Sequence, residues 1–167
     1  MKIYFAGSIR GGRSDIRIYE QLIKHLRRHG EVLTEHVADP GISEKGKDGI
    51  TDAEIYRKDM EWLSEADAVV AEVTTPSIGV GYEIGLAERL GKPILCLFNN
   101  SKIRHSFSEG GTKGKMLSAM VSGNPHILLR HYTESKEAKC FIDDFINHLS
   151  ADSAKAQAPA GQESSEA

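Results

Sequence analysis

Residues 68–98 read AVVAEVTTPSIGVGYEIGLAERLGKPILCLF, a stretch in which two apolar runs flank a segment of helical character. The runs at 68–73 and 93–98 are almost wholly apolar, as is typical of strands that helices cover on both faces. The segment between them, 79–90, is followed by Gly91-Lys92-Pro93, which is a helix stop signal. A strand, a helix and a strand in succession predict two parallel strands of one sheet.

The same alternation continues on both sides of this stretch. Further strands are expected at 2–6, 31–35 and 126–130, and further helices at 15–29, 51–65, 115–121 and 135–149. Thr51, with Glu54 three residues later, forms a capping box at the start of one of these helices. The sequence therefore predicts an α/β fold, a five-stranded parallel sheet with helices on both faces.

The chain divides into one folded region and a short tail. Its 167 residues are 40% hydrophobic, which suits a single domain with a core. We expect that domain to span residues 1–150. Residues 151–167 are small, polar and free of aromatic side chains, and we expect them to be disordered. Two long loops, 38–50 and 99–114, are expected to serve as lids or binding loops.

Composition narrows the class of function. The formal charge of −3 gives no basic surplus for a polynucleotide partner, although a few local groups can still hold a small anion. Cys96 and Cys140 form neither a disulfide framework nor a zinc-ligand set, which favours a reducing compartment. The sequence shows no signal segment and no apolar run of membrane-spanning length, so we expect a cytoplasmic protein, with the nucleus as a second location.

The first chemical feature follows the strand at 2–6. Residues 7–13, GSIRGGR, bring glycines, a hydroxyl and two guanidinium groups to the carboxyl end of a strand, where ligands bind in open α/β sheets. Glycines let the backbone turn its N–H groups toward an anion, so a phosphate site is favoured over a merely flexible turn. The segment matches neither the Walker spacing nor G-x-G-x-x-G.

Two carboxylates are the leading catalytic candidates. Glu83 follows a helix start at Pro76, Ser77 and Gly79, where Ser77 can cap the helix or donate to a phosphate. A covalent glycosidase nucleophile must be an ionised carboxylate that is held in place, and a glutamate near a helix start can meet this need. A surface glutamate that merely complements the helix dipole would occupy the same position in the sequence. Asp59 falls in the middle of the apolar stripe of helix 51–65, so it needs a partner or a function.

Four further residues are ambiguous from the sequence. Tyr4 can project from the upper end of the first strand, where most tyrosines serve packing. His36 ends the second strand and could meet a base or a phosphate, or simply close the strand. His25 and His29 are four apart on helix 15–29 and could in principle bind a metal, but the helix pattern offers no third ligand beside them. They are therefore predicted to form a solvent-exposed face, and no metal is expected.

Taken together, these segments resemble the 2′-deoxynucleoside 5′-phosphate N-hydrolases (Rcl), a family within the nucleoside 2-deoxyribosyltransferase superfamily. The resemblance covers residues 2–149 and rests on two glycine-rich segments, 4–13 and 76–85, with support from residues 33–36, 59, 71–73 and 117–120. It implies a flavodoxin-like sheet, a homodimer, and hydrolysis of a deoxynucleoside 5′-monophosphate to a free base and 2-deoxyribose 5-phosphate. It implies no cofactor and no metal.

The same resemblance implies a role for each site residue. Glu83 is the nucleophile that attacks the anomeric carbon, while Asp59 acts near the base and Tyr4 orients Glu83. The residues expected to hold the phosphate are Gly7, Ser8, Ile9, Arg10, Gly11, Gly12, Arg13, Ser77 and Gly79. The residue expected beside the base is His36. The residues expected from the neighbouring subunit are Ser118, Ala119 and Met120.

Two other functions remain open. A nucleoside 2-deoxyribosyltransferase would pass the sugar to a second base instead of water, but it has no use for a phosphate-binding set. A non-catalytic nucleotide sensor would gain nothing from two carboxylates beside an anionic ligand. The preferred base also stays open, with 5-hydroxymethyl-dUMP and purine deoxynucleotides as candidates. Segment 99–114 is longer than the family pattern and could change that preference.

Overall fold

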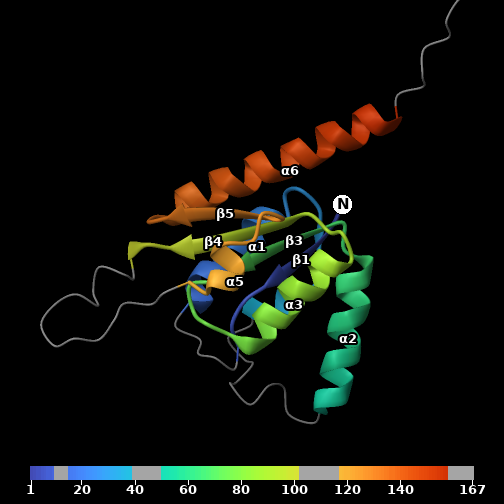
Figure 1. Cartoon of the computed structure of the whole chain (residues 1–167), viewed down its shortest axis with the longest axis vertical. Helices are drawn as coiled ribbons and strands as arrows, with labels where there is room; N and C mark the ends of the chain where they lie inside the picture. Colours follow the sequence, from blue (N-terminus) through green and yellow to red (C-terminus); the bar gives the residue numbers. More distant parts are fainter. Residues whose placement is uncertain (10–14, 39–49, 102–116, 158–167) are drawn as a thin grey trace, which may run out of the picture.

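Five parallel strands form one sheet in the order β2-β1-β3-β4-β5 (Figure 1). The strands are β1 (Lys2–Ala6), β2 (Glu31–Val32), β3 (Ala68–Glu72), β4 (Ile94–Asn99) and β5 (Ile127–Tyr132). This computed structural model describes residues 1–9, 15–38, 50–101 and 117–157. The strand order is that of flavodoxin-like folds, so the predicted fold class is confirmed.

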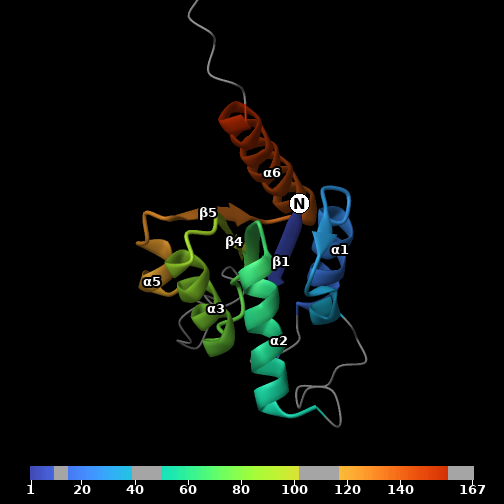
Figure 2. The same cartoon turned by 90° about the vertical axis from the view of Figure 1, so that its right-hand side faces the viewer.

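Helices cover both faces of the sheet, which Figure 2 shows with β1 between α1 and α2. The helices on one face are α1 (Ile16–Leu26) and α6 (Ser135–Gln157). Those on the other face are α2 (Asp52–Glu65), α3 (Ile78–Arg89) and the short α5 (Ala119–Ser122). Each face carries its own hydrophobic core, as expected for a parallel sheet buried on both sides.

Strand β1 sends its residues alternately into the two cores. Ile3 and Phe5 enter the core beneath α1 and α6. Tyr4 and Ala6 enter the core beneath α2 and α3. Tyr4 is therefore directed toward the two helices that carry the carboxylate candidates, and it is only 2% exposed.

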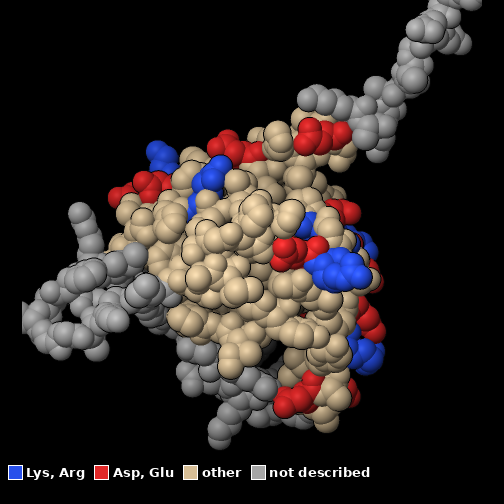
Figure 3. All heavy atoms as spheres, viewed as in Figure 1, with Lys and Arg blue, Asp and Glu red and all other residues tan. Residues whose placement is uncertain are grey.

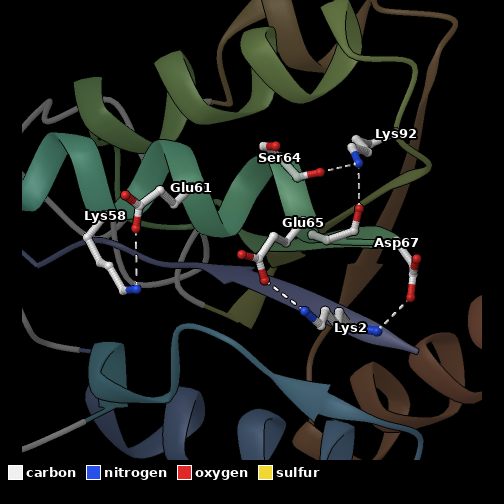
Figure 4. Close-up of polar contacts among 8 residues, drawn as sticks. Lys2, Lys58, Glu61, Ser64, Glu65, Asp67 and Lys92 are labelled. Atoms are coloured by element: carbon white, nitrogen blue, oxygen red, sulfur yellow. Dashed lines mark hydrogen bonds and ion pairs between the residues drawn. The ribbon is translucent and has the colours of Figure 1, made fainter.

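Polar contacts fix both ends of α2. At its start, Thr51 Oγ1 accepts from the Glu54 N–H at 3.3 Å, and the Glu54 carboxylate accepts from the Thr51 N–H at 2.8 Å. The predicted capping box is thus confirmed. At its end, the Lys92 ammonium donates to the carbonyls of Ser64 and Ala66 at 2.8 and 2.7 Å (Figure 4). A cation at this end also complements the helix dipole.

The carboxyl end of α2 is also tied to β1. The Lys2 ammonium donates to the Glu65 carboxylate at 2.7 Å, and the Lys2 N–H donates to Asp67 at 2.7 Å (Figure 4). Both contacts are exposed, so each contributes little to stability. They join the end of α2 and the residue before β3 to the start of the strand that carries Tyr4.

Helix α3 begins and ends at residues that the sequence marks. Ser77 is its N-cap, and the Ser77 hydroxyl accepts from the Val80 N–H at 3.4 Å. Gly91 follows the last turn with φ of 68°, a left-handed conformation that favours glycine. The observed helix starts and stops one residue before the predicted range 79–90.

Strand β2 is shorter than predicted, because the expected strand 31–35 ends at Val32. Thr34 is the reason. Its hydroxyl accepts from the Phe5 N–H at 2.8 Å and donates to the Phe5 carbonyl at 2.7 Å, so a side chain replaces the backbone ladder. The chain then turns into a 3₁₀ helix, η1 (Glu35–Ala38). His36 lies in η1 and not at a strand end, which corrects the prediction.

Helix α6 is longer than predicted. The expectation that disorder begins at Ala151 is wrong for residues 151–157, where the helix continues to Gln157. Alanine is the best helix former, so the small residues that indicated disorder can equally extend a helix already anchored by packing. Residues 158–167 lie outside the described part of the chain. Among the helices described, none is both long and apolar enough to cross a membrane.

Candidate active site

Three side chains from separate elements converge between β1, α2 and α3. Tyr4 comes from β1, Asp59 from α2 and Glu83 from α3. The negative charges of Asp59 and Glu83 both act on Tyr4, and the Tyr4 hydroxyl is hydrogen bonded to the Glu83 carboxyl. The structure thus brings together the three residues predicted to perform the chemistry.

Burial dominates the electrostatics of Glu83. It raises the pKa of Glu83 to about 7, and the neighbouring Asp59 charge adds to the rise, while the hydrogen bond with Tyr4 opposes it. Glu83 lies beyond the first turn of α3, which begins at Ile78. The helix dipole acts mainly within the first turn, so it does not outweigh burial here.

Asp59 lies half-buried on the inner side of α2, as its place in the apolar stripe predicts. Burial raises the pKa of Asp59 to about 6. Two nearby carboxyls with raised pKa values resist ionising together, so near neutral pH part of the protein keeps one proton on the pair, mainly on Glu83, whose pKa is the higher. Such a pair can supply an acid and an ionised carboxylate at once. Burial also raises the pKa of Tyr4 far above its usual range, so its hydroxyl stays neutral.

In the segment after β1 the backbone lies close to the Tyr19 side chain. A Cβ on Gly7 would lie 3.0 Å from the Tyr19 ring, so glycine is the residue that fits there. The Ser8 N–H donates to the Tyr19 hydroxyl at 3.1 Å. The Ser8 hydroxyl is buried, and within the described structure its oxygen has no hydrogen-bond partner. A buried unpartnered hydroxyl is unfavourable and is suited to receiving a ligand.

The remaining residues of this segment divide into two groups. The side chain of Ile9 packs partly against the core beneath α1 and α6. The other predicted phosphate ligands of the segment lie outside the described residues; they are Arg10, Gly11, Gly12 and Arg13. Ser77 and Gly79 lie at the start of α3, where Gly79 is exposed and a Cβ on it would meet only the Ser77 hydroxyl, at 3.8 Å.

His36 borders the site from η1. Its ring lies against the Trp62 ring of α2, with centroids 5.2 Å apart and planes tilted by 34°. The Lys58 ammonium lies 5.0 Å from the centre of the same Trp62 ring. Trp62 is three residues from Asp59 on α2, so this aromatic pair forms a wall next to the carboxylates. A flat base can stack on such a wall.

Ser118, Ala119 and Met120 form the exposed start of α5. A pocket of about 470 Å³ lies between this segment and α3, lined among others by Gly81, Gly85, Ser118 and Met120. Residues 81 and 85 lie on the side of α3 away from Glu83, since each residue turns the helix by about 100°. Within one chain, Ser118 and Glu83 thus border opposite sides of α3.

Sequence reasoning missed a buried polar network at the carboxyl ends of the central strands. Glu72 is fully buried and accepts from the Thr74 hydroxyl and, at 3.0 Å, from the Tyr132 hydroxyl. Thr75 donates to Asp15 at 2.6 Å, which joins the turn before α3 to the start of α1. The available signal was a single carboxylate in the otherwise apolar run 68–73.

His25 and His29 are not on a solvent-exposed face, so that prediction is wrong. The His25 side chain is 9% exposed and that of His29 19%, because α6 packs against α1 and brings Asp143 to both rings. This is the one group of three metal-ligand side chains among the described residues, and it lies apart from Asp59 and Glu83. Asp143 is too distant in sequence for the helix pattern to reveal.

Comparisons with known proteins cover the folded region. The sequence profile of the nucleoside 2-deoxyribosyltransferase family matches residues 3–150. A protein of Esox lucius named 5-hydroxymethyl-dUMP N-hydrolase is 45% identical over 157 residues, which cover 91% of this chain and 100% of the relative. A protein of Danio rerio with the same name is 44% identical, covering 89% and 98%. The solved structure of a Clostridium botulinum CMP N-glycosidase shares the fold, with a TM-score of 0.59 at 19% identity over 86% of this chain and 98% of that one.

Proposed function

This chain belongs to the nucleoside 2-deoxyribosyltransferase family, and on that premise we propose that it hydrolyses the N-glycosidic bond of 2′-deoxynucleoside 5′-monophosphates. The products are a free nucleobase and 2-deoxyribose 5-phosphate. The relatives from Esox lucius and Danio rerio are named for 5-hydroxymethyl-dUMP, which makes that nucleotide the first substrate to test. The reaction needs no cofactor.

The observation that carries this proposal is the carboxyl pair of Asp59 and Glu83 beside Tyr4. Both carboxyls titrate near neutral pH, at about 6 and about 7. N-glycoside cleavage with a covalent intermediate needs one carboxyl to donate a proton while the other attacks ionised. Two acidic side chains would oppose a site that only bound an anionic nucleotide.

In the first step an ionised Glu83 oxygen bonds to C1′ as the bond from C1′ to the base nitrogen breaks. The electron pair of that bond goes to the base, which takes a proton from Asp59. The sugar has oxocarbenium character in the transition state, and a sugar without a 2′-hydroxyl reaches it more easily. Tyr4 holds Glu83 in place through the hydrogen bond between their side chains.

In the second step water attacks C1′ and the bond from C1′ to Glu83 breaks. Asp59, now ionised, accepts the proton of the attacking water, and Glu83 leaves as a carboxylate. Two displacements at the same carbon retain its configuration. Asp59 thus acts as an acid and then as a base, a change of role that suits a pKa near neutrality.

The phosphate site is proposed at two neighbouring strand ends. The hydroxyl of Ser8 after β1 supports it, because it is buried and has no hydrogen-bond partner among the residues that the structure describes. Ser77 and Gly79 support it too, because they lie at the start of α3, where backbone N–H groups and the helix dipole favour an anion. The guanidinium groups of Arg10 and Arg13 would complete the set. His36 is proposed beside the base, next to Trp62.

The protein is proposed to act as a homodimer whose sites are shared between subunits. Ser118 borders the side of α3 away from Glu83 of its own chain, which supports a role in the partner's site. The surface over α3 and α5 is largely uncharged (Figure 3). It exposes Ile78 at 95% and Met120 at 82%, and Gly81 leaves open space above the helix. An apolar surface of this kind is suited to a subunit contact.

The test is a product assay on 5-hydroxymethyl-dUMP and a panel of purine and pyrimidine deoxynucleoside monophosphates. Ribonucleotides and unphosphorylated deoxynucleosides serve as controls. We expect free base and 2-deoxyribose 5-phosphate from at least one deoxynucleotide, and very slow release from its nucleoside. Binding of a deoxynucleotide without release of any base would instead identify a sensor.

A transferase of the same family is the second candidate, because the matched family is named for transfer to a base. Adding an excess of a second free base distinguishes the two reactions. A hydrolase forms the sugar phosphate at the same rate with or without the added base. A transferase forms a new nucleotide and releases sugar phosphate slowly.

A further inference from the structure

Two histidines and an aspartate meet where α1 packs against α6, outside the proposed active site. His25 lies in the last turn of α1, and His29 follows in the turn after that helix. Asp143 comes from α6. Its Oδ1 lies 2.7 Å from Nε2 of His25 and 2.6 Å from Nε2 of His29, so both rings are directed at one oxygen.

The cluster has the composition and geometry of a transition-metal site. Two imidazole nitrogens and one carboxylate oxygen lie within 4.8 Å of one another. Three such ligands plus water are a common set for Zn²⁺, and imidazole selects zinc, copper and nickel over magnesium and calcium. The two rings are edge to face, with centroids 5.6 Å apart, and Nε2 of each ring faces the Asp143 oxygen.

A metal ion needs slightly more room than the hydrogen bonds now occupy. Ligand atoms around a tetrahedral zinc lie roughly 3.3 Å apart, given zinc-to-ligand distances near 2.0 Å. The Asp143 oxygen would therefore move away from each ring by about half an ångström, and the two imidazole nitrogens, which lie within 4.8 Å of each other, would move closer together. Its side chain is 40% exposed, so it can move, and it leaves a path for water to a fourth position.

The surroundings favour an ordered site. The His25 and His29 rings are mostly buried, which limits the entropy lost when they bind an ion.

We propose that His25, His29 and Asp143 bind a zinc-like divalent transition metal that joins α6 to α1. The site lies toward the edge of the sheet where strands begin, since His29 precedes β2 and β2 starts beside Lys2 of β1. The proposed catalytic groups lie on the other face of the sheet, between β1, α2 and α3. The metal is thus structural, and its effect is on the attachment of α6.

His148 supplies a matched control on the same helix. It lies 3.4 Å from Asp152, an exposed histidine and carboxylate four residues apart without a third ligand among the described residues. If one histidine beside one carboxylate were enough to bind zinc, His148→Gln would weaken zinc binding as much as a substitution at His25, His29 or Asp143. The exposed thiol of Cys140 is removed by Cys140→Ser in every protein tested, so that it does not bind metal itself.

The experiment measures zinc per chain in the untagged Cys140→Ser protein, by competition with a chromophoric chelator. We expect one zinc per chain in this background, in the His148→Gln variant and in the Glu83→Gln variant. We expect at least tenfold weaker binding in Asp143→Asn and in His29→Gln, each checked for fold by circular dichroism. Zinc should also raise the melting temperature of the background and not of Asp143→Asn.

Three outcomes would overturn the proposal. The background protein could bind no zinc, which would leave the cluster as hydrogen bonds alone. Asp143→Asn and His29→Gln could both bind zinc as tightly as the background. Glu83→Gln could lose the zinc, which would place the ion at the catalytic carboxyls. Because the assay reads metal content and melting, failure of the proposed hydrolase activity would leave its result unaffected.

Discussion

The Glu83 side chain must combine two opposing properties, burial and charge. Burial raises its pKa to about 7, so a sizeable part of the protein carries a protonated Glu83 at neutral pH. Protonated glutamic acid is no nucleophile, and the hydrogen bond with Tyr4 partly restores the ionised form. Replacing Glu83 should therefore affect catalysis and stability in opposite directions.

We expect Glu83→Gln to lower kcat by at least about a thousandfold, because the amide keeps the shape and loses the nucleophilic charge. The folded-state pKa is raised, so ionisation destabilises the native protein as pH rises from the unfolded value of 4.5 through about 7. At pH 8 the free energy of unfolding of the variant should thus exceed that of the parent by roughly 1–3 kcal/mol, and its melting temperature should be higher. Near pH 4 that difference should vanish.

Steady-state kinetics and melts at both pH values check this expectation. Near-normal turnover by Glu83→Gln with an intact fold would show that Glu83 is not the nucleophile. If the variant and the parent differed in stability by the same amount at pH 4 and at pH 8, ionisation of Glu83 would not be the cause of the difference.

The pH dependence of kcat/KM tests the division of roles between the carboxyls. Activity needs Glu83 ionised and Asp59 protonated, which is the less populated of the two singly protonated forms because the pKa of Glu83 is the higher. The profile should still be bell-shaped, with limbs near 6 and 7 that belong to the pair. Asp59→Asn should lower kcat/KM by roughly a hundredfold or more and remove the alkaline limb. The variant should retain a single acid limb, which then belongs to Glu83 alone.

A profile of Asp59→Asn that still falls at alkaline pH would exclude Asp59 as the acid. Tyr4→Phe is the matched comparison, since it removes the hydrogen bond to Glu83 and leaves both carboxyls in place. It should shift the acid limb upward, because that hydrogen bond lowers the pKa of Glu83.

At the scale of elements, helix starts were the most predictable features. The capping box of Thr51 and the Ser77 cap depend on short-range chemistry that a single sequence displays. The inner side of α2 was predictable for the same reason, and Asp59 with it. The end of β2 was not, because the Thr34 hydroxyl competes with the backbone ladder only when Phe5, 29 residues away, lies opposite.

The pKa values and the metal-ligand cluster were also beyond sequence reasoning. The rise at Glu83 comes from burial and from Asp59, both of which require the packing of α2 against α3. His25 and His29 were visible as a pair, but Asp143 is 114 residues beyond His29. Sequence patterns predict local structure, whereas contacts between elements that are distant in sequence determine the pKa values of the carboxyls.

The last turns of α6 should contribute little to the fold. Residues 151–154 are exposed, whereas the anchors of the helix, Ile142, Phe145 and Ile146, come earlier. A chain ending at Ser150 should keep its activity and change its unfolding free energy by less than about 1 kcal/mol. Phe145→Ala is the control, with an expected loss of about 3 kcal/mol or more. Urea unfolding of both proteins measures the two free energies of unfolding. If the truncated chain lost as much stability as Phe145→Ala, the expectation would be refuted.

At the scale of the molecule, the two sides of α3 would serve two sites. Mixing a Glu83→Gln protein with a Ser118→Asp protein tests whether the site is shared. The added Asp charge should repel the substrate phosphate. Each hybrid dimer would carry one site with both groups intact, so the mixture should recover about a quarter of wild-type activity after random exchange. A mixture as inactive as its parents, with exchange confirmed by mass spectrometry, would contradict a shared site.

The wall beside the carboxylates has a practical use, because Trp62 is the single tryptophan of the chain. Its indole contacts the His36 ring and lies 5.0 Å from the Lys58 ammonium, so its fluorescence responds to the polarity and charge around the proposed base position. A base stacked there should change the emission intensity. The Glu83→Gln protein should not consume the substrate, so a titration followed by Trp62 fluorescence would give the dissociation constant of a nucleotide without a label and without turnover.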